Sequence, residues 1–130
     1  MESYNNNNVN HFNEQMRIRT KQFAIRVYKS LHALKLNDLA KVPARQLLRC
    51  ATSVAANFRS AARGRSDAEF YSKICIVVEE CDESVFWIEF MTETEILNQN
   101  QTKDLHKEAG ELLCIFSTIK KKLRLKKEHQ

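Results

Sequence analysis

The amino-acid sequence predicts an all-α protein, folded as an antiparallel up-down four-helix bundle. Apolar residues recur every three or four positions in four separate stretches, the spacing of one face of a helix. The 130 residues include only two glycines and one proline, too few for the many turns of a sheet protein. Short polar segments separate the stretches, and short connections favour antiparallel neighbours. Hydrophobic residues at 43% and charged residues at 28% fit one globular domain.

The N-terminal segment, residues 1–13, is polar and contains four consecutive asparagines. We expect a disordered tail there, followed by the bundle domain over residues 14–127. The segment has neither the basic start nor the apolar stretch of a signal peptide. No apolar run approaches the roughly 18–20 residues of a membrane helix. The sequence therefore favours a cytoplasmic protein without a membrane role.

The first two helices are expected over residues 14–36 and 43–63. The first apolar stripe is Met16, Phe23, Val27, Leu31 and Leu34. The second is Leu47, Ala51, Val54, Phe58 and Ala61. Pro43 disfavours a helical conformation at Val42 and suits the first turn of a helix, so the second helix is expected to begin there. Gly64 is expected to cap its end.

The third helix is expected over residues 66–97 and the fourth over residues 102–127. Ser66 and Glu69 have the spacing of a capping box, in which each side chain bonds the other residue's backbone. The third stripe is Phe70, Ile74, Val77, Cys81, Ser84, Ile88 and Met91. The fourth is Leu105, Ala109, Leu112, Phe116, Ile119 and Leu123. The amide-rich residues 98–101 are expected to form the connection between them.

Charge is unevenly distributed along the chain. Residues 66–97 hold nine acidic residues and one basic residue, a net charge of −8, whereas the other residues hold seven acidic and twenty basic, a net charge of +13. The third helix is therefore predicted to be an acidic rod among basic neighbours. One interpretation is interhelical pairing of Arg49 with Glu80 or Glu83, with Asn57 in the same polar set.

Nucleic-acid binding is the functional interpretation of the basic residues, because it begins with clustered Lys and Arg on one surface. The candidate phosphate contacts are Arg45, Arg59 and Arg63 of the second helix and Lys120, Lys121, Lys122, Arg124, Lys126 and Lys127 near the C-terminus. The alternative for the C-terminal run is a solvated helix end. No glycine-aromatic strand motif or zinc knuckle accompanies these residues.

The third helix carries more apolar surface than one bundle stripe requires. Either it is the central helix of a tight bundle, or its outer face is a subunit interface. Phe86, Trp87 and Phe90 are the candidate interface residues, because aromatic side chains dominate interface energetics. The sequence therefore predicts self-association.

Residue patterns for catalysis, cofactor binding or metal binding are not recognisable. The Glu80–Glu83 spacing suits a di-iron bundle, but the required histidine is missing. There is no Gly-rich phosphate loop and no nucleophile in a recognisable setting. The cysteines at 50, 75, 81 and 114 form no metal-ligand pattern, and we expect reduced thiols packed as small hydrophobes. We therefore expect no enzymatic activity, no cofactor and no small-molecule substrate.

Four blocks of the central helices form a recognisable combination: LLRCATSVAANFR at 47–59, ARGRS at 62–66, EFYSKI at 69–74 and EECDESVFWIE at 79–89. Together they resemble the bacterial four-helix bundle family of the 23S rRNA intervening-sequence protein. They hold 35 of the 130 residues, and the resemblance in helix layout covers most of the chain. Their combination is specific although each block alone is weak. Arg49, Asn57, Glu80, Glu83 and Trp87 match family positions. Position 50 is Cys where Ser is expected in many relatives.

The resemblance implies a left-handed bundle and a ring-like homo-oligomer, expected to be a pentamer. Some members of the family are encoded within insertions in the large ribosomal RNA gene. Relatives serve diversity-generating retroelements as accessory subunits that contact RNA or DNA. The resemblance thus implies a non-enzymatic, homo-oligomeric nucleic-acid-binding protein. A protein–protein interaction adaptor without a nucleic-acid role is the alternative.

Overall fold

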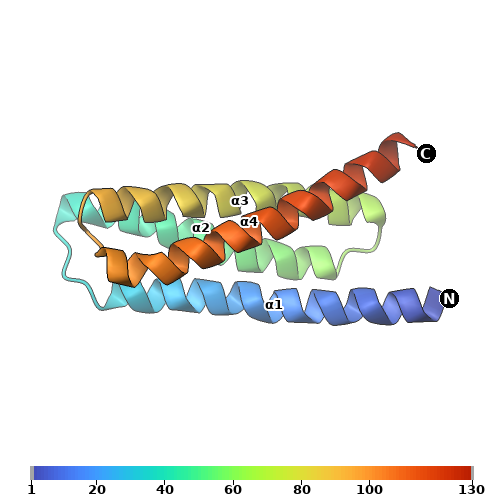
Figure 1. Ribbon diagram of the computed structural model, residues 1–130, viewed down its shortest axis with the longest axis horizontal. Helices are drawn as coiled ribbons and strands as arrows, with labels where there is room; N and C mark the ends of the chain where they lie inside the picture. Colours follow the sequence, from blue (N-terminus) through green and yellow to red (C-terminus); the bar gives the residue numbers. More distant parts are fainter. Residues whose placement is uncertain (1, 130) are drawn as a thin grey trace.

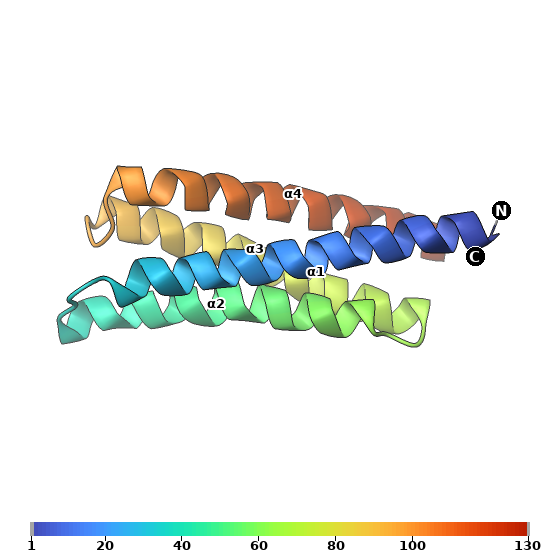
Figure 2. The same ribbon diagram turned by 90° about the horizontal axis from the view of Figure 1, so that it is seen from below.

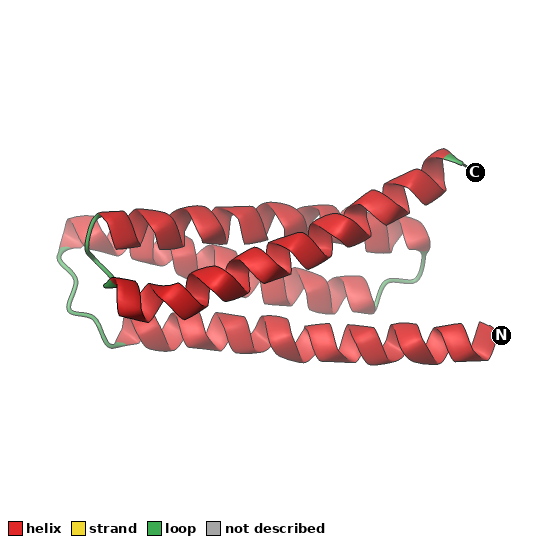
Figure 3. Cartoon of the chain, in the orientation of Figure 1, coloured by secondary structure: helices red, strands yellow, loops and turns green. Residues whose placement is uncertain are grey.

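The computed structural model describes residues 2–129 and contains four α-helices, which confirms the all-α four-helix prediction. They are α1 (Glu2–His32), α2 (Asp38–Ala62), α3 (Asp67–Glu93) and α4 (Gln99–Glu128). Figure 3 shows three short loops between them and no strand in this part of the chain. None of the four helices has an apolar segment long enough to cross a membrane.

Each helix packs against the next one in the chain, and α1 also contacts α4. Over the described residues, α1 and α3, and likewise α2 and α4, lie diagonally across the bundle, where no Cα atoms come within 8 Å and only side chains meet through the core. The loops 33–37 and 94–98 lie at one end of the bundle, and the loop 63–66 lies at the other end, close to both chain termini (Figure 1). Figure 2 shows the same arrangement from the side of α1. The outer faces of α1 and α3 therefore lie on opposite sides of the molecule.

The first helix differs from the sequence prediction at its start. We expected a tail over residues 1–13, but α1 begins at Glu2, and Met1 lies outside the described residues. Phe12 packs against the core because it stands four residues before Met16 and so extends the apolar stripe by one turn. The asparagine-rich composition concealed this extension.

The second helix begins earlier than predicted, at Asp38. The side chain of Asn37 caps it by accepting a hydrogen bond from the backbone N–H of Ala40 at 2.8 Å. Pro43 therefore lies inside the helix and not at its first position, and it leaves the carbonyl of Leu39 without a helical donor. Leu39 is 82% exposed, so water can satisfy that carbonyl.

The end of α2 explains why residue 64 is glycine. Arg63 is the C-terminal cap, and the N–H of Gly64 donates to the carbonyl of Ala61 at 3.0 Å. A Cβ atom at position 64 would stand 3.0 Å from that same carbonyl oxygen. The close approach at the helix end thus favours glycine at position 64, while the cap itself is Arg63.

The third helix begins at its predicted cap. The N–H of Glu69 donates to Ser66 Oγ at 3.1 Å, as predicted, but the Glu69 carboxylate accepts from the N–H of Arg65 and not from that of Ser66. The helix ends at Glu93, four residues earlier than expected. Leu97 is buried in the following loop, and its N–H donates to the carbonyl of Met91 at 3.0 Å.

The fourth helix begins at Gln99, within the segment expected to be a connection. Asn98 and Gln101 form a reciprocal capping box, with side-chain to backbone distances of 2.8 and 3.1 Å. Amide side chains suit both loops and helix caps, and here they act as caps.

The core lies along the axis of the bundle and consists mainly of the four predicted stripes, joined by Leu97 from the loop 94–98. Its largest side chains with almost no exposure are Phe23, Val27, Leu47, Val54, Phe58, Ile74, Val77, Ile88, Met91, Leu97, Leu112 and Phe116. The rings of Phe58 and Phe116 join α2 to α4 across the centre, with centroids 5.2 Å apart. Each fully buried side chain of this size contributes about 1.5–3 kcal/mol by leaving water.

Candidate functional site

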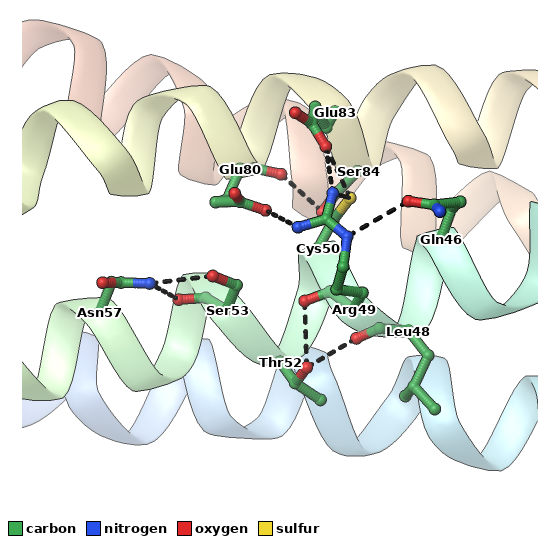
Figure 4. A network of polar contacts seen from close by, with 10 residues as sticks. All are labelled: Gln46, Leu48, Arg49, Cys50, Thr52, Ser53, Asn57, Glu80, Glu83 and Ser84. Atoms are coloured by element: carbon green, nitrogen blue, oxygen red, sulfur yellow. Dashed lines mark hydrogen bonds and ion pairs between the residues drawn. The ribbon is translucent and has the colours of Figure 1, made fainter.

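Arg49 connects α2 to α3 through a polar network on the side of the bundle (Figure 4). Its guanidinium donates to Glu83 at 2.6 Å and to Glu80 at 3.4 Å. Its Nε also donates to Gln46 at 3.2 Å on its own helix. Glu80 and Glu83 both meet one guanidinium because residues three apart share a helix face. The predicted interhelical Arg–Glu pairing is therefore present in the geometry.

Asn57 does not take part in this interhelical pairing, in contrast to the sequence prediction. Its side-chain amide donates to the backbone carbonyl and to the hydroxyl of Ser53, both at 2.9 Å and both on α2 (Figure 4). An asparagine inside a helix readily bonds the carbonyl four residues earlier. Its polar group is therefore satisfied locally, and within the described residues no hydrogen bond joins Asn57 to α3.

Cys50 lies buried beneath the same network. Its thiol donates to Glu83 at 3.2 Å. Burial, together with this hydrogen bond, raises the pKa of the Cys50 thiol to about 12, and burial raises the pKa of Cys81 to about 12 as well. Thiolates are the reactive form, so neither cysteine is a nucleophile near neutral pH. Cys114 is exposed, which contradicts the expectation that all four thiols are packed inside.

The donor atoms of Cys50, Glu80 and Glu83 lie within 4.8 Å of one another, which resembles a metal-binding group. The guanidinium of Arg49 contacts both carboxylates and the sulfur atom. A cation there would have to displace the arginine and compete with its fixed positive charge. The arrangement is that of an interhelical ion-pair network.

The predicted phosphate-contacting arginines of α2 are exposed but are spread along the helix. Arg59 lies in its last turn and Arg63 is its C-terminal cap, the first residue of the loop 63–66, whereas Arg45 lies in the first half of the helix, towards the opposite end of the bundle. Arg59, Arg63 and Arg65 line a shallow hollow of about 490 Å³ that also includes Glu69. Arg65 is a basic residue that the sequence interpretation missed, although it directly follows the glycine beside Arg63.

The C-terminal basic residues lie at the same end of the molecule as this hollow (Figure 1). Arg65 and Leu123 line one common hollow, which brings the end of α4 next to the loop 63–66. Lys126 lies 3.8 Å from Asp67, and the Lys127 ammonium lies 5.7 Å from the ring centre of Tyr71, so these two lysines face α3. We define the basic end as Arg59, Arg63, Arg65, Lys120, Lys121, Lys122 and Arg124.

Phe86, Trp87 and Phe90 form an aromatic cluster on α3. Their ring centroids are 4.8 to 6.1 Å apart. Trp87 is half-buried against the core, whereas Phe86 and Phe90 are 55% and 39% exposed. The sequence interpretation grouped all three as outward residues, but only the two phenylalanines offer a large free surface.

A second exposed apolar surface lies on α1, and the sequence interpretation missed it. Ile18 and Tyr28 are 49% and 52% exposed, and Ile25 between them is partly exposed. Positions 18, 25 and 28 recur at seven- and three-residue steps, so they lie on one helix face. Lys21 and Lys29 are exposed residues of the same helix. This offset stripe was visible in the sequence beside the core stripe.

Comparison with known proteins gives the chain its family. Residues 13–117 match the profile of the 23S rRNA-intervening sequence protein family. A crystal structure from Bacteroides thetaiotaomicron, described as a protein with unknown function from the S23 ribosomal protein family, is 28% identical. The alignment covers 81% of this chain and 97% of that one, with a TM-score of 0.73. No curated protein matches. The chain belongs to the 23S rRNA-intervening sequence protein family.

Proposed function

We propose that this protein is a non-enzymatic, cytoplasmic homo-oligomer that binds RNA or DNA through its basic end. In this proposal the helices form an antiparallel, left-handed up-down bundle, and the expected assembly is a pentamer. The observation that carries the proposal is that the basic segment around the loop 63–66 and the basic end of α4 lie at one end of the molecule, where Arg65 and Leu123 line one hollow.

The electrostatics of the basic end support phosphate binding. Over the described residues, none of its seven cationic side chains takes part in an ion pair of 4.0 Å or less. Exposed cations without internal partners attract polyanions and release their counterions on binding. Such a surface contacts the phosphate backbone and reads no base sequence.

The test is a salt titration of binding to an RNA duplex and a DNA duplex of equal length, followed by fluorescence anisotropy. The variant Lys121→Gln/Lys122→Gln/Arg124→Gln should bind both more weakly, and its plot of log K against log salt should lose about two to three units of slope. The matched control Lys103→Gln/Lys107→Gln neutralises two exposed lysines near the start of α4 and should leave the slope close to that of the wild type. Absence of binding by the wild type in low salt would refute the nucleic-acid role.

A protein–protein interaction adaptor is the second candidate function, and the exposed rings of Phe86 and Phe90 favour it. An adaptor would retain a stoichiometric protein partner when purified from a nuclease-treated lysate. Replacement of Phe86 by glutamate would release that partner, while the basic-end variant would retain it.

A further inference from the structure

We infer that copies of this chain associate side by side through two different faces. The outer face of α3 in one copy docks on the outer face of α1 in the next. This inference rests on the homo-oligomer of the proposed function and names the two surfaces that meet. The α3 surface is Phe86 and Phe90 with their acidic neighbours. The α1 surface is Ile18, Ile25 and Tyr28 with Lys21 and Lys29.

Both surfaces expose large apolar side chains to solvent. Phe86, Phe90, Ile18 and Tyr28 account for four of the eight large hydrophobic side chains that are exposed among the described residues. Two are aromatic residues on α3, and two lie on the outer stripe of α1. Exposed apolar clusters bordered by charged residues mark interaction surfaces.

The charges decide which surface meets which. Helix α3 holds eight acidic residues and one basic residue, and α1 holds two acidic residues and five basic residues. An α3-to-α3 contact would bring net charges of −7 and −7 together, and an α1-to-α1 contact would oppose +3 to +3. Only the mixed contact brings opposite charges together.

The charged residues beside the aromatic surfaces are available for such a contact. Glu79 and Asp82 on α3 and Lys21 and Lys29 on α1 are exposed. Within residues 2–129, none of these four forms an ion pair with another part of its own chain. A neighbouring copy can therefore supply their partners without breaking an existing pair.

The heights of the two surfaces along the bundle also match. Helices α1 and α3 run in the same direction and end at the same end of the molecule (Figure 1). Tyr28 lies four residues before the end of α1, and Phe86 and Phe90 lie seven and three residues before the end of α3. Lys21 and Asp82 each lie eleven residues before the end of their helix. At about 1.5 Å per residue, copies standing side by side at the same height bring these groups together.

The position of the two surfaces dictates the type of assembly. Since α1 and α3 lie diagonally across the bundle, their outer faces point to opposite sides, and each copy therefore offers two different faces, one for each of its neighbours. Such a heterologous contact closes into a ring when the rotation between copies allows it. It differs from a two-fold dimer, in which one face would meet itself.

The experiment uses two variants that each destroy one face: Tyr28→Glu on α1, and Phe86→Glu/Phe90→Glu on α3. Light scattering should show an oligomer for the wild type and a monomer of 15.2 kDa for each variant alone. An equimolar mixture should form a dimer of twice that mass, because each variant retains the face that the other one needs. Recovery of the dimer also demonstrates that both variants are folded.

The variant Leu39→Glu is the matched control, because it places the same charge on an exposed apolar side chain of α2 outside both surfaces. It should keep the mass of the wild-type oligomer. An unchanged oligomer with Tyr28→Glu, or a mixture that stays monomeric, would overturn only the proposed contact between the α3 face and the α1 face. A monomeric wild type would overturn the homo-oligomer of the proposed function as well.

Discussion

Two helix interfaces, α2–α3 and α1–α4, each contain one arginine that pairs with two glutamates, but they differ in how extensively the helices pack. In the first, Arg49 meets Glu80 and Glu83; in the second, Arg19 meets Glu108 and Glu111 with closest contacts of 2.6 Å or less. Both glutamate pairs are three residues apart on one helix. The α2–α3 interface is the most extensive in the molecule, and the α1–α4 interface is the smallest.

The comparison indicates that the same ion-pair arrangement can contribute differently to stability at two interfaces. Arg49 adds polar contacts to helices that already share a broad packed surface. Arg19 bridges two helices that share little else, and it is 34% exposed against 50% for Arg49, whereas the carboxylates Glu108 and Glu80 are equally shielded at 15% and 14%. Shielded pairs are screened less by water and salt than open ones. The smallest interface should thus depend most on its arginine.

The largest expected effect comes from removing the packing at the centre of the bundle. Phe58→Ala should lower the free energy of unfolding by about 3–5 kcal/mol, because it leaves a cavity beside Phe116 at a fully buried site. Urea denaturation followed by circular dichroism measures this loss. A loss below about 1 kcal/mol would mean that core packing is not the main source of stability. The extent of packing would then not explain a difference between the two interfaces.

The next effect concerns the buried thiols of the packed interface. Folding raises the pKa of Cys50 and of Cys81 from 9.0 to about 12. The stabilisation linked to each neutral thiol is complete below pH 9 and is lost as the pH rises towards 12. Each thiol should then lower stability by at most on the order of 1 kcal/mol per pH unit over this range. The double variant Cys50→Ala/Cys81→Ala should show a shallower loss between pH 9 and 11 in chemical denaturation; an identical slope would contradict the prediction.

Replacing each arginine in turn should have a smaller effect and tests the comparison of the two interfaces directly. Arg19→Met should lower stability by about 1–2 kcal/mol and speed amide exchange along α1, because Glu108 loses both of its charge-assisted bonds. The matched variant Arg49→Met should cost about 0.5–1 kcal/mol, since that arginine is half exposed and its helices stay packed. Hydrogen exchange measures the local effect. Equal protection of α1 in both variants would remove the distinction between the two interfaces.

The core and the helix count were predictable from the sequence, whereas the helix ends were not. The apolar stripes repeat often enough to define four helices, and the side chains of those stripes fill the core. The ends depend on single side chains such as Asn37 and Asn98, whose amides suit a loop as well as a cap. Helix α1 was predicted too short because the composition of its first residues outweighed the position of Phe12.

The candidate sites were predictable only in part, for a similar reason. Opposite charges on neighbouring helices indicated the pairing of Arg49, but spacing alone did not show that Asn57 would bond Ser53 instead. The sequence named the basic residues without showing that Arg45 lies far from the others along the bundle. The outer stripe of α1 was missed because one apolar stripe already explained that helix.

Both chain termini emerge at the end of the bundle that carries the basic residues, away from the loops 33–37 and 94–98 (Figure 1). A purification tag or fluorescent protein fused to either terminus would therefore stand beside the proposed nucleic-acid surface. It could mask that surface without disturbing the fold. A label inserted in residues 33–37 would sit at the far end and leave the basic residues accessible.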